Sequence, residues 1–298
     1  MQERILMFFQ EHSSPFWDAA AEAVTMLGEQ YFFIVIITFI YWIISRKAGF
    51  KLAVIFVFSS VFNAVLKIAF RTPRPFEKLS AITGKRVETA TGYSFPSGHT
   101  QSASSFFTAA ALIVRRKWAY ILAAVLMLAV AVTRVYLGVH WPADVLGALV
   151  FGVCIALVLN RVIDACYDSP GTLKKIFLAL EVLVGAVTLL LFILDETTLH
   201  GTWKIHDFFK ISGISLGLVT GYFLQERHIR FDPSRGSVLQ KTLRYVLGLA
   251  LTLGFLLGLK KVFPEHLLFD YLRYAVVGFT VAFLWPWAGT ALRLFIRE

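Results

Sequence analysis

Residues 118–163 of this chain read WAYILAAVLMLAVAVTRVYLGVHWPADVLGALVFGVCIALVLNRVI. Two apolar runs lie in this stretch, 118–137 and 143–163, on either side of a short polar turn. Each run has about the 20 residues that an α-helix needs to cross a hydrocarbon core of ~30 Å. We therefore expect the stretch to form two consecutive transmembrane helices.

Similar apolar runs occur on both sides of this pair. They cover residues 30–46, 52–70, 98–115, 175–194, 207–224, 243–260 and 271–291, and the helix of the first, short run could begin inside the preceding segment. The 298 residues are 57% hydrophobic and only 16% charged, whereas a soluble domain carries about 25% charged residues. We expect an all-α, polytopic membrane helical bundle with about nine transmembrane helices. A soluble, very apolar helical protein would need charged helix faces, which residues 241–262 almost entirely lack.

The N-terminal segment has a different pattern. Within residues 4–28, large apolar side chains lie among polar ones, at Ile5, Phe8, Phe9 and Trp17. This is typical of an amphipathic helix in the membrane interface, although a surface helix packed on the bundle fits the same pattern. Acidic residues interrupt any apolar core in this segment, so we expect no cleavable signal peptide.

The positive charge of the chain lies mostly in short loops. The net charge is +10 and the isoelectric point about 9.7, a balance that can indicate nucleic-acid binding. Here the lysines and arginines concentrate in alternate loops, at 46–51, 115–117, 174–175, 227–244 and 293–297. We therefore expect these loops in the cytoplasm. The opposite side then holds the N-terminus and loops 71–97, 138–142, 195–206 and 261–270, although Lys260 and Lys261 depart from the pattern. The expected partner is a lipid bilayer rather than nucleic acid.

Three polar clusters lie at the outer ends of predicted helices. They comprise Lys67–Pro75, Tyr93–Thr100 and Arg134–Asp144. The charge-derived topology places all three on the same side of the membrane, so we expect them to converge. All three lie within residues 30–165. We therefore separate this helical core from the N-terminal segment, 1–29, and from an apolar transmembrane extension, 166–298.

The clusters supply cations at the edge of an apolar membrane. Lys67, Arg74 and Arg134 are expensive there unless an anion pairs with them, and no nearby loop offers three free carboxylates. Guanidinium groups match phosphate in a bidentate manner. Ser97 and Gly98 precede a predicted helix, whose backbone N–H groups can point at an anion, and glycine allows a phosphate to approach closely. The sequence therefore predicts a phosphate site.

The same clusters supply two histidines. One of His99 and His140 can attack phosphorus while the other protonates the leaving oxygen. Asp144 follows His140 by four residues, a spacing that brings a carboxylate to an imidazole on the first turn of a helix. Such a carboxylate fixes the tautomer and stabilises the imidazolium.

These residues resemble the type 2 phosphatidic acid phosphatase superfamily, over about residues 30–165. The family pattern is Lys-x6-Arg-Pro, then Pro-Ser-Gly-His, then Ser-Arg-x5-His-x3-Asp. Lys67 with Arg74-Pro75 matches the first part, and Pro96-Ser97-Gly98-His99 matches the second. Arg134, His140 and Asp144 match the third, with Thr133 in place of the usual serine. Threonine keeps the hydroxyl group.

The resemblance implies a role for each matched residue. His140 would be the nucleophile that forms a phosphohistidine, Asp144 its orienting partner, and His99 the general acid that later activates water. The phosphate cradle would consist of Lys67, Arg74, Ser97, Gly98 and Arg134. Members of the family need no metal ion, so no metal ion and no other cofactor are expected.

The function that we expect is a membrane lipid phosphatase, a hydrolase acting at the non-cytoplasmic face of a bacterial inner membrane. Undecaprenyl diphosphate and phosphatidylglycerol phosphate are the favoured substrates, ahead of phosphatidic acid and a sphingoid phosphate. Three alternatives remain open: a phosphatase for a soluble phosphomonoester such as glucose 6-phosphate, a lipid phosphotransferase, and a lipid transporter. Residues 166–298 carry no comparable polar cluster apart from Glu181 within a predicted helix, and could be a structural extension or a homodimer surface.

Overall fold

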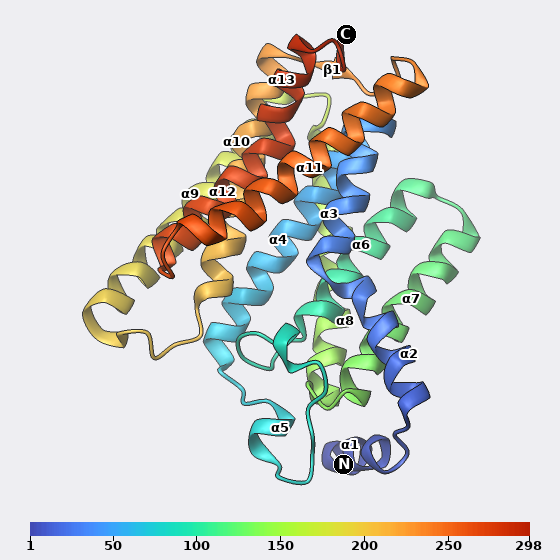
Figure 1. Ribbon diagram of the computed structural model, residues 1–298, viewed down its shortest axis with the longest axis vertical. Helices are drawn as coiled ribbons and strands as arrows, with labels where there is room; N and C mark the ends of the chain where they lie inside the picture. Colours follow the sequence, from blue (N-terminus) through green and yellow to red (C-terminus); the bar gives the residue numbers. More distant parts are fainter. The chain divides into compact units, whose positions relative to one another are not determined.

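The computed structural model describes residues 1–298, and nearly all of its regular structure is helical (Figure 1). The α-helices are α1 (Gln2–Glu11), α2 (Pro15–Thr25), α3 (Gln30–Phe39), α4 (Arg46–Phe70), α5 (Pro75–Lys78), α6 (Gly98–Val114), α7 (Lys117–Tyr136), α8 (Pro142–Cys166), α9 (Pro170–Leu194), α10 (His206–His228), α11 (Val238–Val262), α12 (Leu267–Phe279) and α13 (Trp285–Ala291). Two short strands, β1 (Phe231–Asp232) and β2 (Ile296–Arg297), pair antiparallel. The predicted all-α membrane fold is confirmed.

Fewer helices than expected have the length and hydropathy of a membrane span. Six do so, namely Arg46–Lys78, Lys117–Tyr136, Pro142–Cys166, Pro170–Leu199, Val238–Val262 and Leu267–Ala291. A bent pair, Pro15–Gly28 with Gln30–Ile44, would make a seventh. The two expected spans that fall outside this set are helical in the structure, as α6 and α10. Both carry buried polar side chains, including Gln101 in α6 and Gln225 in α10, and α6 has only 17 residues.

The N-terminal segment is not the single helix that the sequence predicted. It forms α1 and α2, which are separated at Ser13 and Ser14. The Ser14 side chain accepts a hydrogen bond from the backbone of Trp17, and Pro15 occupies the first position of α2. Proline cannot continue a preceding helix, so the chain restarts there. Beyond Gly28, α2 is followed by α3 at a bend of 48°.

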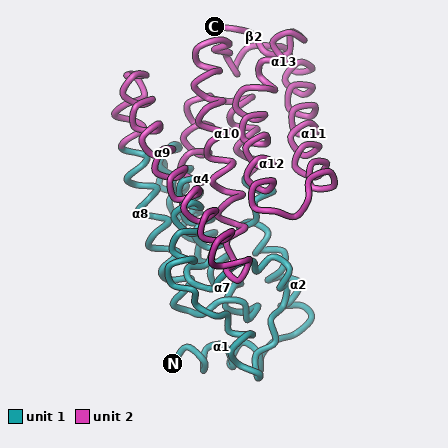
Figure 2. The backbone as a smooth tube through the Cα atoms, turned by 90° about the vertical axis from the view of Figure 1, so that its left-hand side faces the viewer, with its two compact units in different colours: residues 1–33, 58–161 teal, residues 34–57, 162–298 magenta.

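The chain forms two compact units, which Figure 2 colours separately. Unit 1 comprises residues 1–33 and 58–161, and unit 2 comprises residues 34–57 and 162–298. Within unit 1, α6 and α8 approach closely at Gly152, where an added Cβ would strike the Ser104 side chain and the Gln101 carbonyl. Small residues permit such close packing between membrane helices.

Unit 2 is organised around α10 and α12. Three glycines of α10, Gly213, Gly217 and Gly221, recur at every fourth residue and face α12 and the π-helical segment Thr280–Leu284 that follows it. A Cβ at Gly217 would meet the Ala275 carbonyl, so the two backbones are in direct contact there. This is the small-xxx-small pattern of membrane helix pairs.

Candidate active site

The turn between α7 and α8 positions His140, and the first turn of α8 positions Asp144. Their side chains meet, with His140 Nδ1 3.2 Å from Asp144 Oδ2. The same oxygen accepts hydrogen bonds from the Ser94 hydroxyl at 2.5 Å and from the Trp141 backbone at 2.8 Å. Asp144 is therefore held in place and in turn fixes the His140 ring.

Arg74 contacts the other side of the His140 ring. Its Nη1 lies 3.2 Å from His140 Nε2. Since a guanidinium group only donates, Nε2 is the unprotonated acceptor and Nδ1–H faces Asp144. Burial lowers the pKa of His140 well below its ordinary value, and the Arg74 charge lowers it further. His140 is therefore neutral at pH 7, with its lone pair on Nε2.

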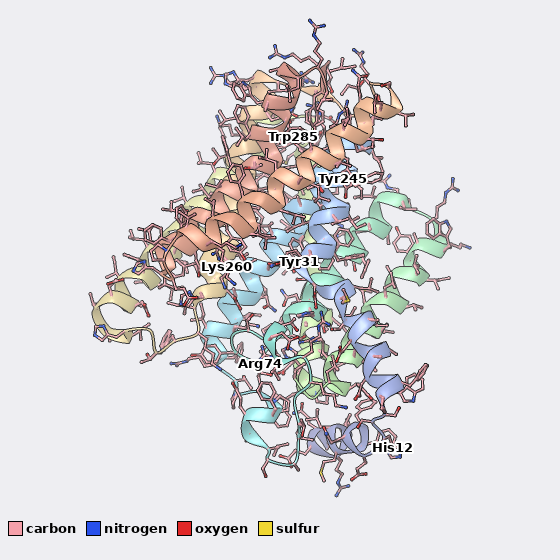
Figure 3. All side chains as sticks on the ribbon, in the orientation of Figure 1. His12, Tyr31, Arg74, Tyr245, Lys260 and Trp285 are labelled. Atoms are coloured by element: carbon pink, nitrogen blue, oxygen red, sulfur yellow. The ribbon has the colours of Figure 1, made fainter.

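Carbonyl groups from two loops fix Arg74, which is 1% exposed and labelled in Figure 3. Its guanidinium donates to the Thr91 carbonyl at 2.6 Å, to the Val139 carbonyl at 2.9 Å and to the Gly92 carbonyl at 3.3 Å. Lys67 Nζ donates to the same Thr91 carbonyl at 3.0 Å. The two cations thus share one backbone anchor, and Gly92 supplies the positive φ of 65° that this turn requires.

Arg134 and His99 carry buried nitrogens without a partner. Arg134 is 0% exposed, and its Nη1 donates to the Thr25 hydroxyl at 3.0 Å. Its Nε and Nη2 make no hydrogen bond, and neither does His99 Nε2. A buried polar group left unpaired costs about 1–3 kcal/mol, so these nitrogens are expensive unless a ligand pairs with them.

Ser97 and Gly98 lie where α6 begins. The Ser97 hydroxyl accepts a hydrogen bond from Thr100 at 3.1 Å, and its backbone N–H donates to the Asp144 carbonyl at 3.1 Å. A Cβ built on Gly98 would lie 3.9 Å from Lys67 Nζ, so the backbone here runs beside that cation. The structure thus brings the predicted residues of all three clusters together within unit 1.

Some contributors to the site were not predicted. Ser94 belongs to the cluster Tyr93–Thr100, but a serine between two aromatic residues did not indicate that its hydroxyl would hold Asp144. Thr25 and Gly28 belong to the N-terminal segment, which the sequence did not connect with the site. A Cβ on Gly28 would lie 2.9 Å from His99 Cβ, so this glycine allows the segment to pack against α6. A threonine and a glycine at the end of an amphipathic segment are too common to signal such a role.

Known proteins resemble this chain in two regions. The sequence model of the PAP2 superfamily matches residues 48–168. A second, described as "PAP2 superfamily phosphatase, transmembrane extension", matches residues 209–297. The two matches fall on the helical core and on the C-terminal helices, and together they cover most of the chain.

Parts of this chain are also similar to curated proteins and to a solved structure. An undecaprenyl-diphosphatase from Sulfolobus acidocaldarius is 33% identical over 44% of this chain and 61% of its own length. Sphingosine-1-phosphate phosphatase 1 from Rattus norvegicus is 25% identical over 88% of this chain and 69% of its own length. A crystal structure of a transmembrane PAP2-type phosphatidylglycerolphosphate phosphatase from Bacillus subtilis aligns with a TM-score of 0.47 and 24% identity, covering 55% of this chain and 85% of that one. The chain is an integral membrane protein and belongs to the PAP2 superfamily.

Proposed function

We propose that this chain is a lipid phosphatase that removes phosphate from a lipid phosphate or diphosphate through a phosphohistidine on His140. The observation that carries the proposal is the environment of His140, which Asp144 contacts at Nδ1 and Arg74 at Nε2. A neutral imidazole held in this way presents its lone pair beside a cation suited to the phosphate that it attacks.

The phosphate cradle consists of Lys67, Arg74, Ser97, Gly98 and Arg134. The unpaired Nε and Nη2 of Arg134 can both donate to one phosphate, which would satisfy groups that are otherwise buried without a partner. The N-terminus of α6 adds backbone N–H groups and the positive end of a helix dipole. These cations neutralise the charge of the phosphate, and we infer that no metal ion is required.

In the first step, His140 Nε2 attacks phosphorus and the bond from phosphorus to the lipid oxygen breaks. Burial and the charge of Arg134 lower the pKa of His99 well below its ordinary value, so its protonated form depends on the negative charge of the bound phosphate. In that form His99 donates its Nε2 proton to the departing oxygen, which leaves as the lipid alcohol or, from a diphosphate, as the lipid monophosphate. Asp144 stabilises the positive charge that develops on the His140 ring.

In the second step, His99, now neutral, takes a proton from water while the water oxygen attacks phosphorus. The bond between phosphorus and His140 Nε2 breaks, inorganic phosphate leaves, and both histidines return to their initial states. The proton lost by His99 in the first step is regained in the second, so the cycle consumes only water.

We favour undecaprenyl diphosphate or phosphatidylglycerol phosphate as the substrate, in the inner membrane of a bacterium. The proposed site lies at the ends of membrane helices, where the phosphate of a lipid can reach it while the lipid chain stays in the bilayer. The relatives include proteins named undecaprenyl-diphosphatase and sphingosine-1-phosphate phosphatase 1. The active site would face the non-cytoplasmic side, because the basic loops lie at the other ends of its helices.

The test is phosphate release by the purified protein in detergent containing EDTA. The panel contains undecaprenyl diphosphate, phosphatidylglycerol phosphate, phosphatidic acid, sphingosine phosphate and glucose 6-phosphate. We expect lipid hydrolysis that vanadate inhibits and that His140→Ala lowers by about 10³-fold or more. The matched control is His228→Ala, which removes an exposed histidine of α10 and should leave the rate unchanged.

Two outcomes would contradict the proposal. Equal release by His140→Ala would exclude this histidine as the nucleophile, and a clear preference for glucose 6-phosphate would replace the lipid by a soluble phosphomonoester. The covalent intermediate is tested separately with an aryl phosphate, whose leaving group needs no acid. His99→Ala should then accumulate a phosphoenzyme that is stable in base and labile in acid, and the His140→Ala/His99→Ala double variant should not.

A further inference from the structure

The C-terminal helices hold a cavity that the proposed hydrolase does not use. It lies between α9 and α10 in unit 2, two helices that run side by side in Figures 1 and 2, and has a volume of about 250 Å³. Most of its wall is apolar, from Leu178, Leu216, Val219, Phe223 and Leu224. The remaining lining residues are polar or charged, namely Lys174, Glu181, Thr220 and Arg227.

Two cations mark one end of the cavity. Lys174 lies near the start of α9 and Arg227 near the end of α10, and both side chains are exposed. Neither forms an ion pair with a carboxylate of the protein. Basic pockets between membrane helices on the side of the basic loops attract anionic lipid headgroups. The pair is therefore suited to a phosphate at the edge of the membrane.

A carboxyl group marks the deeper part of the cavity. Glu181 follows Lys174 by seven residues, which is about 10 Å along the helix. The Ser215 hydroxyl of α10 donates a hydrogen bond to it. This position lies among apolar side chains and has no cation, so an anionic headgroup is less stable there than beside Lys174 and Arg227. The favoured orientation of an amphiphile therefore has its anion beside the two cations and its chain along the apolar wall.

We propose that this cavity binds an anionic phospholipid of the leaflet on the basic-loop side. Its phosphate lies at Lys174 and Arg227, and one acyl chain lies between α9 and α10. Only 22% of the most apolar part of the span Pro170–Leu199 is buried in the protein, so an acyl chain in this position adds contacts that hold α9 against α10. The site uses no residue of the proposed active site and stands independently of the hydrolase activity.

The test compares lipid binding to four forms of the protein by native mass spectrometry and by melting in detergent. Phosphatidylglycerol is the probe, because it carries an anionic phosphodiester, and phosphatidylcholine of the same chains is its neutral counterpart. We expect the wild type to bind phosphatidylglycerol more tightly and to melt at a higher temperature with it. Lys174→Gln/Arg227→Gln should weaken that binding by about thirty-fold, since each cation near the membrane surface contributes about a fivefold effect.

The matched control is Lys175→Gln/Lys241→Gln, which removes the same charge from the same side of the membrane without altering the cavity. It should keep the preference for phosphatidylglycerol. Thr220→Trp, which fills the apolar part, should weaken binding of both lipids. Inorganic phosphate at millimolar concentration should not displace the lipid. Equal binding of the two lipids by the wild type, an unchanged preference in Lys174→Gln/Arg227→Gln, or full displacement by inorganic phosphate would overturn the proposal.

Discussion

Arg134 and Arg244 are both fully buried, but their surroundings differ. Arg244 donates to four backbone carbonyls, with distances of 2.8–3.1 Å, from Leu294, Trp42, Pro233 and Arg235. Two nitrogens of Arg134 have no partner at all. A buried charge that is fully hydrogen-bonded holds a fold together, whereas one that lacks partners is tolerated where a ligand supplies them.

This contrast predicts opposite effects on stability. Arg134→Met removes an unsatisfied buried cation, so the melting temperature in detergent should stay the same or rise. Phosphate release should fall by about 10²–10³-fold, as when a single oxyanion donor is lost. Arg244→Met should lower the melting temperature, because four carbonyls lose their donor. If both variants are equally destabilised, Arg134 is a structural residue and not a phosphate ligand.

The lowered pKa of His140 predicts how stability changes with pH. The unfolded chain binds a proton on this imidazole at about pH 6.5, whereas the folded chain binds it only at lower pH. Stability is therefore lost as pH falls from about 6.5 toward the lowered pKa. Below about pH 6.5, the wild type should lose up to about 1.4 kcal/mol more per pH unit than His140→Gln. Melting between about pH 8 and pH 5 measures the difference, and parallel curves would show that His140 is not buried in its neutral form.

The glycines of α10 allow the closest contact between two helices of unit 2, α10 and α12. A Cβ at Gly217 would lie 2.7 Å from the backbone nitrogen of Phe279, a distance that real contacts do not show. Gly217→Ala should therefore force the helices apart and destabilise unit 2 by about 1–3 kcal/mol. Gly254→Ala on α11, where an added Cβ meets no atom, should be neutral or stabilising by up to about 1 kcal/mol. Melting of the two variants in detergent is the measurement, and equal melting temperatures would argue against close packing at Gly217.

The orientation of the protein in the membrane, that is, which loops face the cytoplasm, is a property of the whole molecule. The distribution of lysine and arginine predicts that loop 71–97 lies outside the cytoplasm and that loop 115–117 lies inside. After Cys154 and Cys166 are replaced by alanine, a cysteine can be placed at exposed Glu88 or at exposed Arg116. A membrane-impermeant thiol reagent added to intact cells should label Glu88→Cys, and should label Arg116→Cys only after lysis. The reverse pattern would place the active site in the cytoplasm.

The features that the sequence predicted correctly are local along the chain. Apolar runs of spanning length indicate membrane helices because the bilayer requires a fixed length of helix, wherever the other helices lie. The spacing of His140 and Asp144 likewise brings their side chains together without reference to the rest of the chain, although His140 lies just before α8, which begins at Pro142. The sequence also predicted that the three clusters would converge, because alternate loops must face the same compartment, and they do lie together in unit 1.

Contacts between distant parts of the chain became visible only in the folded molecule. Thr25 reaches Arg134 across 109 residues, and Lys67 and Arg74 share a carbonyl of Thr91. Nor did the sequence indicate that α6 and α10 would bury polar side chains such as Gln101 and Gln225. Each of these features depends on which helix surfaces pack against one another. The residue types involved are common and can pair with many partners, so the sequence alone does not identify the pair that forms.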